Sequence, residues 1–366
     1  MMLIYVLLAL LMLGIMVTVH EWGHFIAARM TGIPVREFAI GFGPKLLGWK
    51  SRRHETTFAL RLIPAGGYCA FYGEDDPDDE ADNDPRAMRK YAVWRRLITV
   101  LMGPVMNFVL AFVVSLGFYL IGGVTEADLG EYMQVTNVVA GGAADQGGIK
   151  AGDVLLAVNG EDAAGVPAGD GQDYRFRELL LKHGAGSAVD ITVRRGEEQT
   201  VISVTPQLSP EGRPLIGIEM GREILSTATV HPGFFACCGL AAQLCVREGG
   251  LILQSLKDLV TGGVGLDQMS GPVGVVSLVA QETREYGPTA YVTLLIFISV
   301  NLGLVNLMPI PGLDGAMIIM LLVEGVRRKS LSRKTETYIK LAGLIALFAL
   351  FIYLTLHDIL NIFTGR

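Results

Sequence analysis

Long apolar stretches alternate with shorter charged segments along this chain of 366 residues. A transmembrane helix needs about 20 consecutive apolar residues to cross a hydrocarbon core of about 30 Å. Four stretches reach that length: residues 3–28, 97–125, 287–313 and 340–362. The pattern predicts a polytopic α-helical membrane protein with four transmembrane helices.

The segment between the second and third of these stretches has a soluble composition, over residues 126–222. We expect a strand, a turn and a strand, then a helix near residues 174–182 and a hairpin of residues 188–194 and 199–205. This order, with A-G-D-V-L-L-A-V-N-G at residues 151–160, resembles a PDZ domain, an α+β fold. A PDZ groove binds a peptide as an added strand, often with a carboxylate at backbone amides. A peptide or a C-terminus is therefore a candidate partner of this insert.

Basic residues follow the first and the third apolar stretches. Arg29 and Arg36 come soon after the first, and residues 327–334 carry five lysines or arginines after the third. The positive-inside rule assigns both flanks to the cytoplasm. We therefore expect both chain termini and the PDZ-like domain on the extracytoplasmic side of a cell membrane, with the metal site described below near the cytoplasmic face.

Residues 224–246 form a further uncharged stretch, which contains His231-Pro232-Gly233 and several hydroxyl side chains. If this stretch crossed the membrane, the next span would end at the opposite face and would separate Asp314 from His20, two candidate metal ligands described below. We therefore interpret residues 224–256 as a surface or amphipathic helix.

The composition agrees with a membrane protein that carries a modest soluble insert. Hydrophobic residues make up 51% of the chain and charged residues 18%, and the mean hydropathy is +0.44. The net charge of −6 does not suggest a nucleic-acid partner. The four cysteines include no C-x-x-C pair, so neither a disulfide framework nor a cysteine zinc site is indicated. The first stretch is not expected to be a cleaved signal peptide, because cleavage would remove the motif at its end.

Ionisable side chains appear near the end of the first apolar stretch as H-E-W-G-H, from His20 to His24. On a helix, positions i and i+4 share a face, so His20 and His24 can direct two imidazoles at one metal ion. Glu21 lies one residue off that face, where its carboxylate can accept a proton instead of binding the metal. Ionisable residues are costly in a membrane helix and usually mark a functional site. The pattern predicts a catalytic zinc site.

Catalytic zinc typically has three protein ligands and one open position, so a third ligand is needed. Asp314 ends the third apolar stretch at a matching depth, shortly after Pro309 and Pro311. Prolines that interrupt a helix inside a membrane leave backbone polar groups that need other partners, so such prolines indicate a structural or functional role. We expect Asp314 to be the third ligand, and we count Pro309 and Pro311 as candidate substrate-binding residues.

The second apolar stretch contains Gly103-Pro104 and Asn107, which are helix-disturbing or polar. In lipid, such residues suit close helix packing or a substrate contact. We count Asn107 as a candidate substrate-binding residue.

Residues 35–72 contain strand-like runs punctuated by glycine and proline. Two interpretations remain open. The segment is either an ordinary cytoplasmic hairpin or a sheet edge beside the metal, able to hold an extended peptide by main-chain hydrogen bonds.

Together the motifs resemble the site-2 protease family of intramembrane zinc metalloproteases, nearest its bacterial RseP/RasP branch. The resemblance rests on H-E-W-G-H, on G-P-x-x-N in the second stretch, on one PDZ-like domain, and on N-x-x-P-x-P-x-L-D-G at residues 306–315. It implies zinc ligands at His20, His24 and Asp314 and a catalytic carboxylate at Glu21. It also implies that Asn306 binds the substrate or the transition state, and that residues 36–72 form a membrane-reentrant β-hairpin.

The resemblance further implies one zinc ion per chain and substrates that are single-pass membrane proteins. Such substrates include anti-sigma factors and signal-peptide remnants, cut after a first extracytoplasmic cleavage. The expected organisation has an N-terminal membrane part at residues 1–125 and a C-terminal membrane part at residues 287–366. Between them lie the PDZ-like insert at residues 126–222 and an extracytoplasmic linker at residues 223–286.

Two other functions compete with proteolysis. The first is an inactive membrane PDZ scaffold. Absence of Glu21 or of one candidate ligand would favour it, and all of these residues are present. A zinc transporter would be expected to show further intramembrane carboxylates or an internal repeat, and the sequence has neither.

Overall fold

The computed structural model describes residues 2–52, 55–73, 84–165, 175–183, 187–208, 214–262 and 270–364. These residues form two compact units. The membrane unit joins Met1–Gly122 to Pro232–Arg366, and the insert is Gly123–His231. The insert is longer at both ends than the predicted residues 126–222, because its first and last strands pair beyond those limits.

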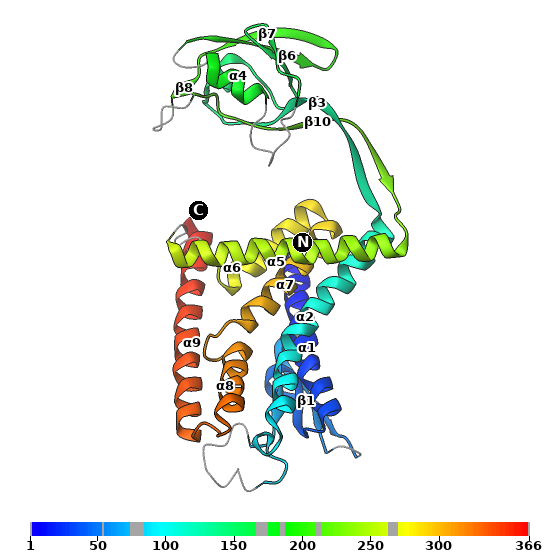
Figure 1. The fold of residues 1–366 in the computed structure, drawn as a ribbon, viewed down its shortest axis with the longest axis vertical. Coiled ribbons are helices and arrows are strands. Elements are labelled where there is room, and N and C mark those ends of the chain that lie inside the picture. Colours follow the sequence, from blue (N-terminus) through cyan, green and yellow to red (C-terminus); the bar gives the residue numbers. More distant parts are fainter. Residues whose placement is uncertain are drawn as a thin grey trace. The chain divides into compact units, whose positions relative to one another are not determined.

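The membrane unit is mostly helical (Figure 1). Its helices are α1 (Met2–Thr31), α2 (Val93–Gly122), α5 (Phe234–Thr261), α6 (Pro272–Tyr286), α7 (Pro288–Leu307), α8 (Asp314–Arg327) and α9 (Arg333–Thr364), with a 3₁₀ turn η2 at Met88–Lys90. Among the described residues, five of these helices are long and apolar enough to cross a membrane by length and composition, namely α1, α2, α5, α7 and α9. The sequence predicted four spans and assigned the α5 region to a surface. Figure 1 shows α5 lying across the ends of the other long helices.

The region assigned to a surface helix, residues 224–256, is only partly helical. Residues up to Val230 belong to strand β10, and α5 begins at Phe234. The physical reason is pairing: Ser226 to Val230 continue an antiparallel ladder with the strand that follows α2. β-Branched residues in this run suit a strand better than a helix.

The third membrane pass is interrupted, where the sequence predicted one stretch over residues 287–313. Helix α7 ends at Leu307 and α8 begins at Asp314. Pro309 and Pro311 lack an N–H and disfavour helical geometry in the residue before them, so the helix cannot continue through this segment. The break places Asp314 at the start of a new helix, inside the membrane unit.

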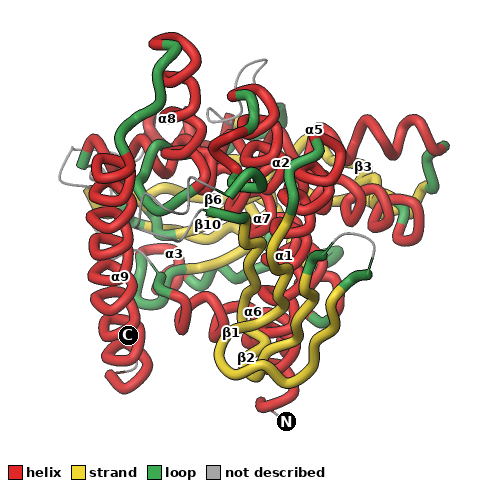
Figure 2. Tube along the Cα trace, turned by 90° about the horizontal axis from the view of Figure 1, so that it is seen from below, coloured by secondary structure: helices red, strands yellow, loops and turns green. Residues whose placement is uncertain are grey.

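Strands β1 (Val35–Lys50) and β2 (Thr57–Phe71) form the predicted antiparallel hairpin. Ala39 of β1 pairs with both Ala59 and Tyr68, so the first half of β1 lies between the two halves of β2. This pairing leaves residues 67–71 at an outer edge of the sheet. Phe25 of α1 packs against Phe38 at a ring separation of 5.4 Å and anchors the hairpin to the helix. Figure 2 shows the hairpin and α9 on different sides of the unit.

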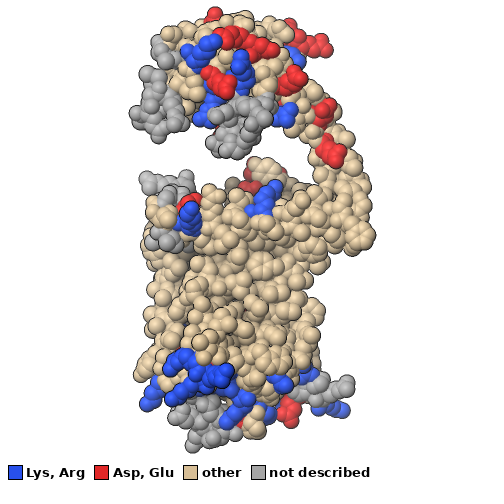
Figure 3. Space-filling model, viewed as in Figure 1, with Lys and Arg blue, Asp and Glu red and all other residues tan. Residues whose placement is uncertain are grey.

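Lysine and arginine side chains gather at one end of the membrane unit (Figure 3). At that end α8 finishes and α9 starts, whereas α1 starts and α9 finishes at the other end (Figure 1). The buried contacts between α1, α6 and α7 include Met12, Met16, Val279 and Leu295.

The insert is a sheet of order β10-β3-β4-β6-β7, with β5 beside β4, flanked by two short helices. Its elements are β3 (Val124–Val138), α3 (Ala143–Gly147), β4 (Val154–Val158), β5 (Glu161–Asp162), α4 (Arg175–His183), β6 (Val189–Arg195), β7 (Glu198–Val204), β8 (Gln207–Leu208), β9 (Pro214–Leu215) and β10 (Ile218–Val230). The predicted hairpin is confirmed as β6 and β7, and the predicted helix as α4, except that Tyr174 lies outside the described residues. Phe176 of α4 is buried in the core against the sheet.

Candidate active site

His20 and His24 lie one turn apart on α1 and point their rings at the same place. Their ring centroids are 4.8 Å apart, and their Nε2 atoms are 3.2 Å apart. Both residues are buried, at 7% and 8% exposure. The helix therefore produces the shared face that the i, i+4 spacing predicted.

Asp314, the first residue of α8, completes a triangle with the two imidazoles. Its Oδ2 lies 3.1 Å from His20 Nε2 and 3.4 Å from His24 Nε2. Tetrahedral zinc with ligand bonds of about 2.0–2.1 Å separates neighbouring ligand atoms by about 3.3 Å. The three atoms thus have the spacing of one face of a zinc coordination tetrahedron. Among the described residues, these three form the group that could hold a metal ion.

Helix α2 approaches the histidines closely enough to contact the far side of each ring. The Nδ1–H of His24 donates to the carbonyl oxygen of Thr99 at 2.9 Å, and the amide of Asn107 lies 3.1 Å from Nδ1 of His20. A Cβ at Gly103 would overlap the His24 ring, and a Cβ at Gly23 would overlap the carbonyl of residue 102. The two glycines allow this approach. Sequence reasoning missed Thr99, because a backbone carbonyl leaves no signal in the residue type.

Glu21 lies between the hairpin and the metal-binding triangle and lines the same cavity as the triangle. The backbone N–H of Cys69 donates to its carboxylate. The backbone of Gly67 passes so near that a Cβ there would lie 3.7 Å from Glu21 Cγ. Glu21 is therefore held between α1 and the outer edge of β2.

A cavity of about 730 Å³ opens beside the triangle and is lined by α1, β2, α7 and α8. Asn306 lines it, together with Glu21 and Tyr68. Asn107, Pro309 and Pro311 are not among its described lining residues. Asn107 instead contacts His20 from behind, and Pro311 packs so closely on α9 that a Cβ at Gly343 would overlap it.

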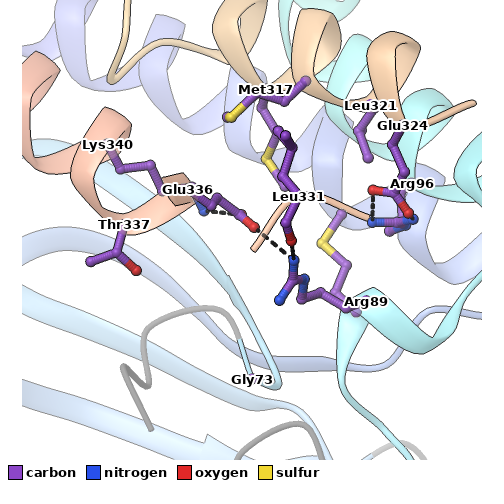
Figure 4. A pocket seen from close by; sticks show the side chains of 12 residues that line it. Gly73, Arg89, Arg96, Met317, Leu321, Glu324, Leu331, Glu336, Thr337 and Lys340 are labelled. Atoms are coloured by element: carbon purple, nitrogen blue, oxygen red, sulfur yellow. Dashed lines mark hydrogen bonds and ion pairs between the residues drawn. The ribbon is translucent and has the colours of Figure 1, made fainter. Parts of the chain in front are cut away.

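A second, smaller pocket of about 60 Å³ lies between η2, α8 and α9 (Figure 4). It shares Met88 and Met317 with the larger cavity. Arg96 of α2 binds Glu324 of α8 through two hydrogen bonds of 2.5 and 3.1 Å, and Arg89 donates to the carbonyl of Leu331. These contacts join the N-terminal and C-terminal parts of the membrane unit beside the cavity.

Two buried imidazoles and an aspartate around one point, with a glutamate beside them in an apolar helical unit, define a membrane metalloprotease. The chain belongs to peptidase family M50, the site-2 proteases, whose family model matches residues 8–350. It is a multi-pass membrane protein and a zinc metalloendopeptidase.

Full-length relatives agree with the family. A protein of Nostoc sp. that is described as a zinc metalloprotease is 31% identical over 96% of this chain and 95% of that protein. A protein of Clostridium perfringens with the same description is 31% identical over 97% of this chain and 98% of that protein. The regulator of sigma-W protease RasP of Bacillus subtilis is 29% identical over 97% of this chain and 98% of that protein.

Among solved structures, the PDZ domain of an SdrC-like protein from Listeria monocytogenes covers 25% of this chain and 87% of that chain. The sequence identity is 19% and the TM-score is 0.21.

Proposed function

We propose that this protein is an intramembrane protease that hydrolyses a peptide bond within or near the transmembrane segment of single-pass membrane proteins. In this proposal His20, His24 and Asp314 hold one zinc ion and Glu21 is the catalytic carboxylate. The observation that carries it is the triangle of two Nε2 atoms and one carboxylate oxygen with sides of 3.1–3.4 Å. When bound, zinc supplies a Lewis acid that polarises a carbonyl and lowers the pKa of a water ligand.

The chain's own residues supply the proton transfer and the orientation. Glu21, held by the Cys69 amide at the cavity wall, accepts a proton from water and can later give it to the leaving amine. Asn306 lines the same cavity from α7, where its amide can bind the substrate backbone. The side chains of Pro309 and Pro311 act mainly by breaking the helix before Asp314.

A helical substrate hides its carbonyls in its own hydrogen bonds and must unwind before it is cut. Residues 67–71 offer an outer strand edge beside Glu21, and pairing with an extended substrate would offset part of that cost. Trp49 and Leu47 of the hairpin are 63% and 64% exposed, which suits a hairpin that re-enters the bilayer. This favours the sheet-edge interpretation over an ordinary cytoplasmic hairpin.

The basic end of the membrane unit supports a cytoplasmic assignment for the start of α9 by the positive-inside rule. Both termini and the insert would then be extracytoplasmic, and four helices would span the bilayer while α5 lies at its surface. The substrates would be anti-sigma factors or signal-peptide remnants that have already lost their ectodomain. The name of the RasP relative, a regulator of sigma-W, supports the first class.

The insert would act as a size filter for substrates that keep a bulky ectodomain. The loop between β3 and α3 uses its amides internally: Gly141 donates to Asp145 at 2.8 Å, and Gly142 and Ala144 donate to carbonyls of the insert. These amides are therefore poorly placed to capture a terminal carboxylate. Deleting the insert should leave zinc binding and cleavage of a trimmed substrate intact, and raise cleavage of the untrimmed one. Slower cleavage of the trimmed substrate alone would favour recruitment instead.

The catalytic assignment is tested with a model transmembrane substrate and the purified protein in detergent. Glu21→Gln should keep one zinc ion per chain and lose cleavage, because an amide cannot accept the proton. His20→Ala should lose both. Near-normal cleavage by Glu21→Gln would refute the proposal, and zinc flux into vesicles without any cleavage would favour a transporter. Zinc-free wild-type protein without cleavage would favour a scaffold.

A further inference from the structure

Asn107 is a fully buried polar residue that contacts a proposed zinc ligand and not the cavity. As placed, its amide nitrogen Nδ2 lies 3.1 Å from Nδ1 of His20, and the residue has 0% exposure. Its own backbone carbonyl accepts a hydrogen bond of 2.9 Å from the hydroxyl of Ser299 on α7. The residue is therefore fixed between α1 and α7, with one amide atom against the imidazole.

The neighbouring histidine shows what such a contact can do. The carbonyl oxygen of Thr99 can only accept, so His24 must carry its ring hydrogen on Nδ1. In the neutral ring, Nε2 then carries the lone pair that a metal can use, and it lies 3.4 Å from Asp314 Oδ2. A histidine that binds zinc through Nε2 needs an acceptor at Nδ1 in the same way.

For His20, Asn107 occupies the position of that acceptor. An asparagine amide can present its oxygen or its nitrogen by a half-turn about its last bond, and the two are assigned from the hydrogen-bond network. Asn107 Oδ1 has no hydrogen-bond partner among the described atoms, so no other contact of that oxygen fixes which way the amide faces. Zinc bound at Nε2 of His20 would leave the ring hydrogen on Nδ1, and a donor there requires Oδ1 instead of Nδ2 to face the ring.

We propose that Asn107 is a positioning residue whose amide oxygen accepts the Nδ1–H of His20 and thereby holds Nε2 ready for zinc. This inference rests on the proposed zinc site and reassigns Asn107 from substrate contact to ligand orientation. The Gly103-to-Asn107 segment of α2 then serves both histidines, through the close approach at Gly103 and the acceptor at Asn107.

The test is the zinc dissociation constant of the full-length protein in detergent, measured by competition with a chelating dye. Asn107→Leu keeps the approximate volume and removes the acceptor, and Asn107→Ala removes the acceptor and the volume. Asn107→Asp keeps an acceptor in the same place. Ser115→Ala is the matched control, because Ser115 is equally buried on α2, and its hydroxyl interacts with the carbonyl of Ala111 and with Cys245 instead of with either histidine.

Asn107→Leu and Asn107→Ala should each weaken zinc binding about 10–100-fold, as loss of an outer-shell partner does. Asn107→Asp should bind zinc at least as tightly as wild type, and Ser115→Ala should be unchanged. Equal zinc binding by Asn107→Leu, or equally weak binding by Asn107→Asp, would overturn the inference. Unchanged zinc affinity with a raised KM would assign Asn107 to the substrate. If wild type itself bound no zinc, the proposed function would fail first.

Discussion

Adding a single methyl group at Gly103 should disable the metal site without touching any ligand. In Gly103→Ala the new Cβ would lie 3.0 Å from Cε1 of His20 and would overlap Cε1 and Nε2 of His24. Helix α2 packs tightly on α1 here, through the matching close approach at Gly23 and the hydrogen bond from His24 to the carbonyl of Thr99. We therefore expect the imidazole rings to move before the helices separate.

The size of the effect follows from the required movement. Ordinary contact starts at 3.4 Å, so the ring of His20 would have to retreat by about 0.4 Å and that of His24 by more. Zinc–ligand distances tolerate deviations of only about 0.2 Å. We expect zinc affinity to fall by about 100-fold or more, equivalent to about 2.7 kcal/mol.

The assay compares zinc affinity and thermal unfolding of Gly103→Ala with those of Gly117→Ala. Gly117 lies on the same helix, and a Cβ there would meet nothing within 4 Å. The control variant should therefore bind zinc like wild type. Gly103→Ala should remain folded, with its loss confined to zinc and cleavage. Wild-type zinc affinity in Gly103→Ala would refute the close approach of α2 to the two imidazoles.

Three further predictions concern stability. Arg96 and Glu324 form an ion pair whose side chains are only 6% and 13% exposed. Arg96→Met or Glu324→Gln alone should lower the free energy of unfolding in detergent by about 3–5 kcal/mol, because each leaves one buried partner unpaired. Replacing both residues by Met should be nearly neutral. Burial alone would raise the pKa of the Asp153 carboxyl, but its hydrogen bonds to Arg195 and a backbone amide hold that pKa below its usual value. The stability that the ionised Asp153 carboxylate contributes to the insert is therefore present above about pH 4 and lost as the pH falls further. In Asp153→Asn, the hydrogen-exchange protection of β4 should therefore depend less on pH in this range than it does in the wild type. Asp358→Ala should destabilise α6 by about 1–3 kcal/mol, and Asp358→Asn by less, because the carboxylate accepts hydrogen bonds from the backbone N–H groups of Gly271, which caps α6, and Gly274, at 3.0 and 2.7 Å.

The features that depend on local spacing could be predicted from the sequence. His20 and His24 share a face because four residues make about one helical turn. The long apolar stretches became helices, and the glycine-punctuated run before the second became a hairpin. Asp314 could be matched to the histidines because its motif ends an apolar stretch of suitable length.

Features that arise from contacts between distant segments could not be predicted. The acceptor at Thr99 is a backbone atom, and the overlap at Gly103 exists only once α2 lies against α1. Ser226 to Val230 read as an uncharged stretch until their pairing with the strand after α2 was known. The break before Asp314 was signalled by two prolines, but its continuation as a second helix required the packing of α8 against α2.

The central claim, that two imidazoles and one carboxylate hold the zinc, is tested most directly by X-ray absorption at the zinc edge. We predict a first shell of nitrogen and oxygen at about 2.0–2.1 Å with two imidazole contributions, and loss of one oxygen ligand or of the metal in Asp314→Ala. A sulfur contribution at about 2.3 Å would point to Cys69, which lines the same cavity. That result, or an unchanged spectrum in Asp314→Ala, would contradict the assignment.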